Sequence, residues 1–241
     1  MNELPVQIYL IPNIIAPDTQ SLVIPPGAID VIKTLDYFLV ENIRSARRFI
    51  ASLKIRNVSE LDFQLFDKRS HQSDLEQLLE PLSRGASIGV ISEAGCPSIA
   101  DPGNKIALWG HQHGIKVTPL TGPSSILLGL MASGLNGQHF EFHGYLPIDQ
   151  SSRERAIRLL EKESSKSGKT QIFMETPYRN TALLEALIRH CQPDTYICVA
   201  SGLTGPDEFI KTYRVKNWKH RLPDVHKKPT VFYMHSNAGD I

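Results

Sequence analysis

The segment at residues 87–103 joins a run of strand-forming residues to the start of a helix through a loop of small residues. The run Ser87-Ile88-Gly89-Val90-Ile91 leads directly into the loop Ser92-Glu93-Ala94-Gly95-Cys96-Pro97. Asp101 as N-cap and Pro102 at the first helical position then predict a helix. Small residues between a buried strand and a helix let the backbone approach a ligand, as at the carboxyl ends of strands in open α/β sheets. An ordinary tight connection is the alternative interpretation.

A second strand–loop–helix unit of the same kind follows. Residues 117–120 predict a short strand, and the loop Thr121-Gly122-Pro123-Ser124-Ser125 precedes an apolar helix over residues 126–132. Ser124 can cap that helix, and Gly122 permits a close approach of the backbone. Two such loops in succession suggest one shared crevice.

Strand-like and helical patterns alternate along most of the chain, which is typical of βαβ units around a parallel sheet. Strands are expected at residues 6–11, 37–40, 87–91, 117–120, 140–146, 170–174 and 196–200. Further helices are expected at residues 28–33, 43–54, 74–83, 153–166 and 177–191. Residues 208–215 and 230–235 are expected as terminal, partly antiparallel strands. A break near residue 120 predicts two α/β domains, residues 1–119 and 120–241, each with a mostly parallel sheet flanked by helices.

Charge and cysteine content limit the possible classes of protein. The net charge of +1 over 241 residues argues against a protein whose whole surface binds nucleic acid. The three cysteines, Cys96, Cys191 and Cys198, have no metal-site spacing and form no pairable framework. The sequence also shows no signal peptide and no apolar run long enough to cross a bilayer. Together with the cysteines, these features predict a cytoplasmic protein without a metal or a membrane anchor.

Five blocks of the sequence, taken in order, carry a family resemblance. They are residues 92–103, 119–125, 133–135, 140–147 and 172–179. Together they resemble the signature of the tetrapyrrole methylase family, and within it the bacterial methyltransferases that act on a cytidine 2′-hydroxyl of small-subunit ribosomal RNA. Several blocks in the right order are more specific than any one of them.

The resemblance implies two α/β domains, S-adenosyl-L-methionine as cofactor in a cleft between them, ribosomal RNA as substrate and a homodimer. A site for this cofactor needs acceptors for its ammonium and diol, helix-end amides for its carboxylate and an apolar slot for adenine. The residues expected to bind it are Pro12, Ser92, Glu93, Ala94, Gly95, Ser124, Ser125, Met131, Leu135, Phe173, Met174 and Ala200. On pattern alone Met131 and Leu135 fit a helical core, and at most one of Phe173 and Met174 faces a ligand because they alternate along a strand.

Transfer of a methyl group to a hydroxyl needs alignment and help in removing a proton. Glu175 and Asp101 are the carboxylates expected to provide that help, although Asp101 also suits a helix cap. The acceptor is expected to meet Arg44, Tyr178 and Arg179. A surface role explains Arg179 equally well.

Four segments depart from the family pattern, at residues 11–19, 41–44, 148–150 and 200–204. The first lacks the usual glycine, the second lacks an acid, the third is not basic and the fourth lacks two charges. Cofactor binding is therefore better supported than the acceptor. A small-molecule acceptor, such as a tetrapyrrole, and a cofactor-binding protein without turnover remain alternatives. The basic residues between 153 and 169 fit a solvated helix face as well as an RNA contact.

Overall fold

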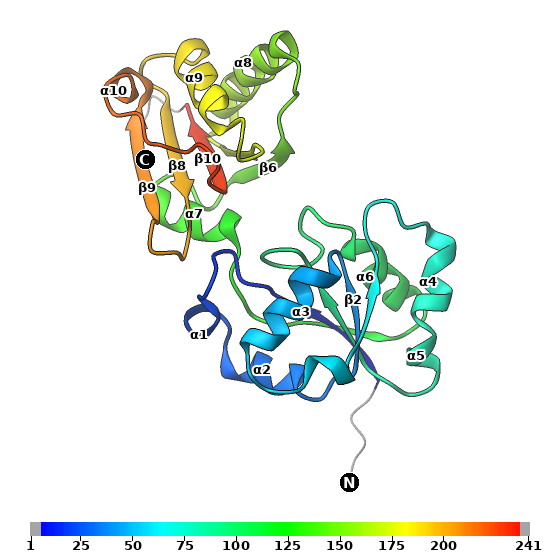
Figure 1. Ribbon diagram of the computed structural model, residues 1–241. Helices are drawn as coiled ribbons and strands as arrows, with labels where there is room; N and C mark the ends of the chain where they lie inside the picture. Colours follow the sequence, from blue (N-terminus) through cyan, green and yellow to red (C-terminus); the bar gives the residue numbers. More distant parts are fainter. Residues whose placement is uncertain (1–5, 237–241) are drawn as a thin grey trace. The chain divides into compact units, whose positions relative to one another are not determined.

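The computed structural model describes residues 6–236 and divides the chain into two compact units, residues 1–124 and 125–241. Each unit is built on one five-stranded sheet with helices packed on it (Figure 1). The strands of the N-terminal unit are β1 (Gln7–Ile11), β2 (Tyr37–Val40), β3 (Asp62–Leu65), β4 (Ile88–Ile91) and β5 (Lys116–Pro119). Its helices are α1 (Gln20–Val23), α2 (Pro26–Ile32), α3 (Ile43–Ser52), α4 (Gln72–Leu78), α5 (Glu80–Ser83) and α6 (Gly103–Gln112), with a 3-10 turn at Val58–Glu60.

The sheet of the N-terminal unit is entirely parallel, in the order β3-β2-β4-β1-β5. Side chains of α2 and α3 pack with Tyr9, Phe38 and Ile91 on one face, and α4 to α6 pack with Ile8 and Val90 on the other. Covering both faces explains why β4 is apolar throughout rather than alternating. All five carboxyl ends therefore meet at one edge, which is where parallel sheets place ligands.

The sequence missed β3 and differs at several boundaries. β3 is a four-residue edge strand with only Phe63 buried, so it has almost no hydrophobic pattern. The helix expected over residues 74–83 is two helices, because the chain turns at Leu79 before Pro81. The expected start at Pro102 moves to Gly103, the first residue of α6.

The C-terminal unit has its own sheet and helices. Its strands are β6 (Phe140–Tyr145), β7 (Thr170–Met174), β8 (Tyr196–Ser201), β9 (Phe209–Arg214) and β10 (Thr230–His235). Its helices are α7 (Ser125–Ser133), α8 (Gln150–Ser167), α9 (Asn180–His190) and α10 (Val215–Trp218). The expectation that Pro177 opens the helix before Cys191 is wrong by three residues, because residues 177–179 form a turn.

The expectation of a mostly parallel second sheet is wrong. In the order β6-β7-β10-β8-β9 only β6 and β7 run parallel, and the other three pairs are antiparallel. For β8 and β9 the physical reason is the length of their connection: residues 202–208 suffice for a hairpin but not for a crossover. The anticipated antiparallel character of residues 208–215 and 230–235 thus extends to most of the sheet.

Helices cover both faces of the second sheet. α8, α9 and α10 pack on a core around Phe173, Phe232 and Trp218. On the other face Gly129 of α7 lies against the ring of Tyr233, whose hydroxyl donates to the carbonyl oxygen of Ser125 at 2.9 Å. Across residues 6–236, none of the helices has the length and apolar character needed to span a membrane.

Candidate functional site

Three loops meet at the carboxyl edge of the parallel sheet, after β1, β4 and β5. A short antiparallel bridge joins the first two: Asn13 N donates to Gly95 O at 2.9 Å, and Gly95 N donates to Asn13 O at 3.2 Å. The third loop touches the same place, because the Cys96 thiol lies 3.4 Å from the carbonyl oxygen of Pro123. The two turns that the sequence singles out, around Gly95 and around Gly122, therefore lie side by side within the N-terminal unit.

Asn13 holds the loop after β4 in place. Its side chain is buried, and Nδ2 donates to the carbonyl oxygens of Ser92 at 3.1 Å and Glu93 at 3.0 Å. The Ser92 hydroxyl donates to Gly95 O at 2.9 Å, so Ser92 is used inside the loop. Glu93 and Ala94 project from this braced loop and are exposed. Sequence reasoning missed Asn13, because one asparagine after a strand has no distinguishing pattern.

Gly122 and Gly95 serve different purposes. A Cβ at position 122 would overlap two ring carbons of the buried Pro12, so Gly122 allows two loops to pack together. The close approach that Gly122 permits is therefore to the ring of Pro12, and protein occupies the space beside this glycine. Gly95 has φ of +72°, a left-handed conformation that disfavours any side chain.

Carboxylates gather beside this loop cluster. Glu41 follows β2, and its Oε2 accepts from the backbone N of Glu93 at 3.3 Å. Asp101 precedes α6, and its Oδ1 accepts from the backbone N of Gly103 at 2.6 Å and of Ser98 at 2.8 Å. Asp101 thus accepts from the first backbone N–H of α6, but the N-cap position is Pro102, one residue later than the sequence predicts. Glu41 was not among the predicted site residues, although it belongs to the segment 41–44 that departs from the family pattern.

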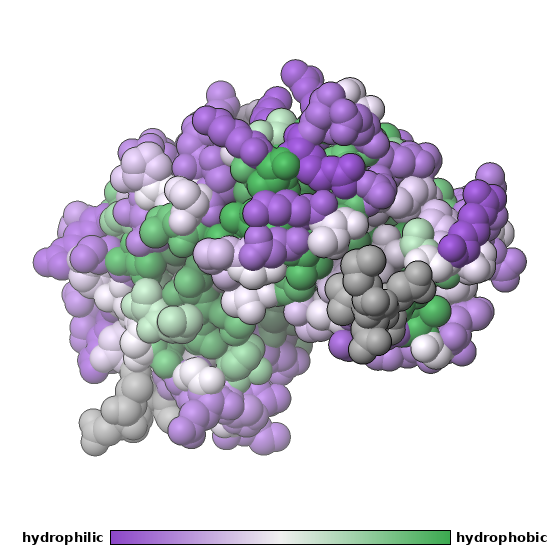
Figure 2. Space-filling model, turned by 90° about the horizontal axis from the view of Figure 1, so that it is seen from below, coloured by the Kyte–Doolittle hydropathy of each residue, from purple (hydrophilic) through white to green (hydrophobic). Residues whose placement is uncertain are grey.

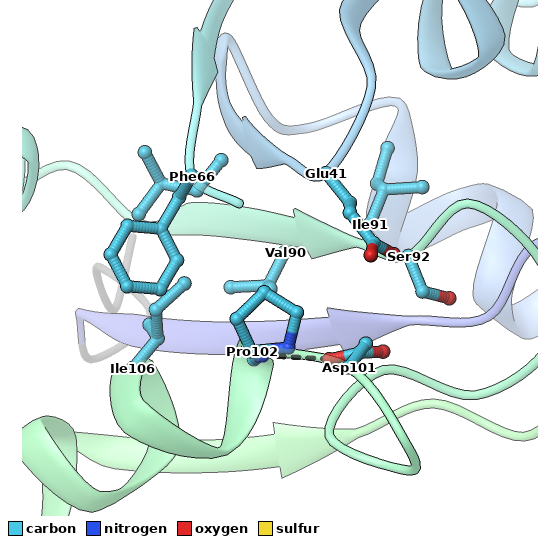
Figure 3. A pocket seen from close by; sticks show the side chains of 10 residues that line it. Glu41, Phe66, Val90, Ile91, Ser92, Asp101, Pro102 and Ile106 are labelled. Carbon is cyan, nitrogen blue, oxygen red and sulfur yellow. Dashed lines mark hydrogen bonds between the residues drawn. The ribbon is translucent and has the colours of Figure 1, made fainter. Parts of the chain in front are cut away.

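Glu41 and Asp101 line a small crevice at this edge (Figure 3). It has about 10 Å³ of free volume, space for one water molecule. Burial raises the pKa of Glu41, and the charges of Asp101 and Glu93 raise it further. Burial also raises the pKa of Asp101, against the opposing effect of its backbone donors and of Lys68. The buried Oδ2 of Asp101 has no hydrogen-bond partner among residues 6–236. The edge therefore disfavours negative charge and favours a cation.

Cys96 lies inside the loop cluster but is not activated. Burial raises the pKa of its thiol, and the charge of Asp101 raises it further. Since the thiolate is the reactive form, the thiol is protonated at neutral pH. Cys96 therefore fills space against Pro123.

Glu175, the other predicted catalytic residue, is buried in the C-terminal unit. It follows β7, and its Oε1 accepts from Arg179 Nη2 and from the backbone N of Thr176, both at 2.6 Å. The Glu175 side chain has no exposed surface, whereas that of Arg179 is 30% exposed. The carboxylate therefore acts on Arg179 in this arrangement, fixing the guanidinium near the surface. A role for Glu175 as a base stays a prediction.

The other predicted substrate residues are exposed. Tyr178 is 72% exposed; the Lys227 ammonium lies 5.8 Å from its ring centroid and the His226 ring 6.2 Å from it. The backbone N of Lys227 donates to Pro177 O at 2.9 Å, which connects the segment of His226 and Lys227 to the turn before α9. His226 and Lys227 were not predicted, because some fifty residues separate them from Tyr178. In the N-terminal unit, Arg44 lies exposed in the first turn of α3.

The predicted cofactor residues of the C-terminal unit differ in exposure. Met131 on α7 is 80% exposed, and Leu135 just after it is buried. Phe173 and Ala200 have no exposed surface, so protein side chains cover them. Met174 is half-buried and is the member of the Phe173–Met174 pair that does not enter the core. At the division between the units, Ser124 directly precedes α7 and Ser125 is its first residue.

The fold and this edge define a two-unit α/β protein with a braced loop cluster at the carboxyl ends of a parallel sheet. The chain belongs to the tetrapyrrole (corrin/porphyrin) methylases, whose sequence model matches residues 23–217. The resemblance carried by the sequence blocks is thereby confirmed.

Three curated relatives share one name. A protein of Vibrio cholerae is 34% identical over 76% of this chain, and one of Bacillus subtilis is 32% identical over 76%. A protein of Escherichia coli O157:H7 is 30% identical over 85%. All three are named ribosomal RNA small subunit methyltransferase I. The chain spans only 61%, 60% and 68% of their respective lengths.

Solved structures agree on the fold. The crystal structure of the methyltransferase CobJ has a TM-score of 0.63 at 17% identity and covers 95% of this chain and 93% of its own. The uroporphyrin-III C-methyltransferase of Thermus thermophilus has a TM-score of 0.54 at 16% identity, with 95% and 94% covered. At this identity the likeness shows the fold alone.

Proposed function

We propose that this protein is an S-adenosyl-L-methionine-dependent methyltransferase that acts on a ribose 2′-hydroxyl of small-subunit ribosomal RNA in the cytoplasm. The observation that carries the proposal is the loop cluster of Asn13, Ser92–Gly95 and Pro123 beside Glu41 and Asp101. The family match and the names of the curated relatives support the reaction and the acceptor.

The residues at this edge fit the methyl donor. S-adenosyl-L-methionine supplies a methyl group on a positively charged sulfonium, and it also carries an ammonium. Glu41, Glu93 and Asp101 supply negative charge where a cation would be stabilised, and Asp101 Oδ2 has an unused acceptor within the described chain. Glu93 and Ala94, the exposed residues of the loop that Asn13 holds, would contact the polar groups of the donor. The candidates for the remaining contacts with the donor are Ser124, Ser125, Met131, Leu135 and Met174.

The chain's own residues would align the acceptor and accept its proton. Because burial raises the pKa of Asp101, that carboxyl is a better proton acceptor than an ordinary aspartate. The Glu175–Arg179 pair presents a guanidinium that suits a phosphate of the substrate. Tyr178 and Lys227 provide an exposed ring and a cation beside it, which suit a nucleotide. Asp101→Asn and Glu175→Gln distinguish the two candidate bases, since replacing the residue that acts as the base should abolish turnover even at saturating donor.

We also propose that the protein forms a homodimer. Support comes from large apolar side chains that are exposed on the C-terminal unit: Leu127 and Met131 on α7, Tyr145 at the end of β6, and Ile148. Figure 2 shows hydrophobic residues gathered on the surface in the region of α7. Sedimentation equilibrium tests this proposal. A monomer at all concentrations would contradict it.

The experiment that tests the function uses small ribosomal subunits from a strain that lacks this protein. Incubation with donor carrying a labelled methyl group should place label on a ribose of the small-subunit RNA, and mapping identifies the nucleotide. Donor binding without any transfer would favour the alternative of a binding protein. Label that appears only in a tetrapyrrole would favour the small-molecule alternative.

A further inference from the structure

Helix α8 carries a stripe of basic side chains that its own unit does not neutralise. The stripe consists of Arg155, Arg158, Lys162 and Lys166, all exposed. Their spacing of three, four and four residues places them within about 100° of the helix circumference. The stripe extends over roughly 16 Å, because each helical residue adds about 1.5 Å. The remaining side chains on it are uncharged: Leu159, which is 66% exposed, and Ser165.

Helix α8 has three acidic residues: Glu163 lies half-buried at the edge of the stripe, and the other two lie off it. Glu161 is turned into the unit, where its Oε1 accepts from the Thr195 hydroxyl at 2.5 Å and from the Gln192 N at 2.7 Å. Glu154 lies beside the stripe and faces His190, with 3.3 Å between its Oε1 and Nε2 of the ring. Within residues 6–236 the four stripe residues make no ion pair with any carboxylate. The positive charge therefore faces outward.

The like charges within the stripe work against the stability of an isolated helix, although Glu154, four residues before Arg158, offsets part of this effect. Arg158 and Lys162, and likewise Lys162 and Lys166, are like charges four residues apart, and such pairs are destabilising. Only Lys166, in the last turn, gains from the helix dipole. Chance does not favour this grouping either, since the whole protein has a net charge of +1. Both points favour a polyanionic partner for this face.

We infer that the stripe on α8 binds the phosphate backbone of the ribosomal RNA substrate outside the site of methyl transfer. This inference rests on the proposed function, because an RNA acceptor brings a row of phosphates with it. A row of cations about 16 Å long can contact several phosphates of one strand. Lysine and arginine on such a face add affinity without reading the sequence. The stripe thus recruits RNA, while the residues near Tyr178 and Arg179 contact the acceptor region.

Two matched double variants test the stripe. The first is Lys162→Gln with Lys166→Gln, which removes two stripe charges and keeps helix propensity, since glutamine and lysine are similar helix formers. The control is Lys211→Gln with Lys219→Gln, which removes two exposed charges of the same unit away from α8. Binding to a transcript of small-subunit ribosomal RNA is measured between about 50 and 200 mM salt.

The stripe variant should bind this RNA about 10- to 30-fold more weakly at 150 mM salt, with a salt slope lower by about 1.4 to 1.8. Its KM for RNA should rise, while kcat at saturating RNA and the affinity for S-adenosyl-L-methionine should not change. The control variant should match the wild type in all of these quantities.

Three results would overturn the inference. If the wild type methylates RNA but both variants bind RNA equally, the stripe is not the contact and the proposed function still stands. If the wild type binds S-adenosyl-L-methionine but no RNA, the proposed acceptor fails and the stripe inference fails with it. If only binding to phosphatidylglycerol vesicles falls in the stripe variant, the stripe serves an anionic lipid surface instead.

Discussion

The packing of Gly122 against Pro12 provides a direct test of how the loop cluster is built. In Gly122→Ala the new Cβ would overlap two carbons of the Pro12 ring. Both atoms belong to a rigid, buried ring, so the loops after β1 and β5 would have to separate by about 1 Å or more to reach normal contact. Overpacking of this kind costs about 1–3 kcal/mol in the free energy of unfolding. Because the same loops are proposed to hold the donor, its affinity should fall as well.

The matched control is Gly27→Ala in the same unit. A Cβ there meets nothing within 4 Å, and Gly27 lies within α2. Alanine is a better helix former than glycine, so this variant should gain about 0.5–1 kcal/mol. Urea unfolding gives both free energies, and isothermal titration with S-adenosyl-L-methionine gives both affinities. A Gly122→Ala protein as stable as the wild type, with unchanged donor affinity, would refute the reasoning.

Three further substitutions test other parts of the account. Asn13→Ala leaves the carbonyl oxygens of Ser92 and Glu93 without their donor, so the free energy of unfolding in urea should fall by about 1–3 kcal/mol and the affinity for the donor should fall too. An unchanged unfolding midpoint would contradict this prediction. Burial raises the pKa of Glu41, so the wild type loses stability as pH rises from the pKa of the unfolded state through that of the folded state. Glu41→Gln should remove that loss, and thermal unfolding measures it at pH 4 and pH 7. The same difference between variant and wild type at both pH values would contradict this prediction. Arg179→Met leaves the Glu175 carboxylate buried without its partner and should cost about 3 kcal/mol in the free energy of unfolding. In a double-mutant cycle this loss should exceed that of Arg179→Met combined with Glu175→Gln, and equal losses would contradict the coupling of the pair.

The strand–loop–helix units were readable from the sequence because their signals are local. An apolar run followed by small residues and an aspartate predicted β4, its loop and the start of α6 to within one residue, without any tertiary information. The parallel sheet followed from the alternation of such units. The family resemblance led to the prediction that these loops bind the cofactor, and the family match bears out the resemblance.

The parts that the sequence did not predict depend on contacts between distant segments. The antiparallel β10 is inserted between β7 and β8, although about thirty residues separate it from the end of β8, and no local pattern encodes that choice. Asn13 acts on a loop some eighty residues later. The raised pKa of Glu41 depends on burial beside Asp101, which only the fold creates. Local secondary-structure propensity predicts none of these three features.

Hydrogen–deuterium exchange with and without S-adenosyl-L-methionine tests the central claim most directly, namely that the loops after β1, β4 and β5 hold the methyl donor. The amides of residues 13–15, 92–96 and 121–125 should exchange more slowly when the donor is present at a concentration that titration shows to be saturating. Peptides over α2 and over α10 should not change. Saturable binding that protects other regions and leaves these three loops unprotected would contradict the assignment of the site.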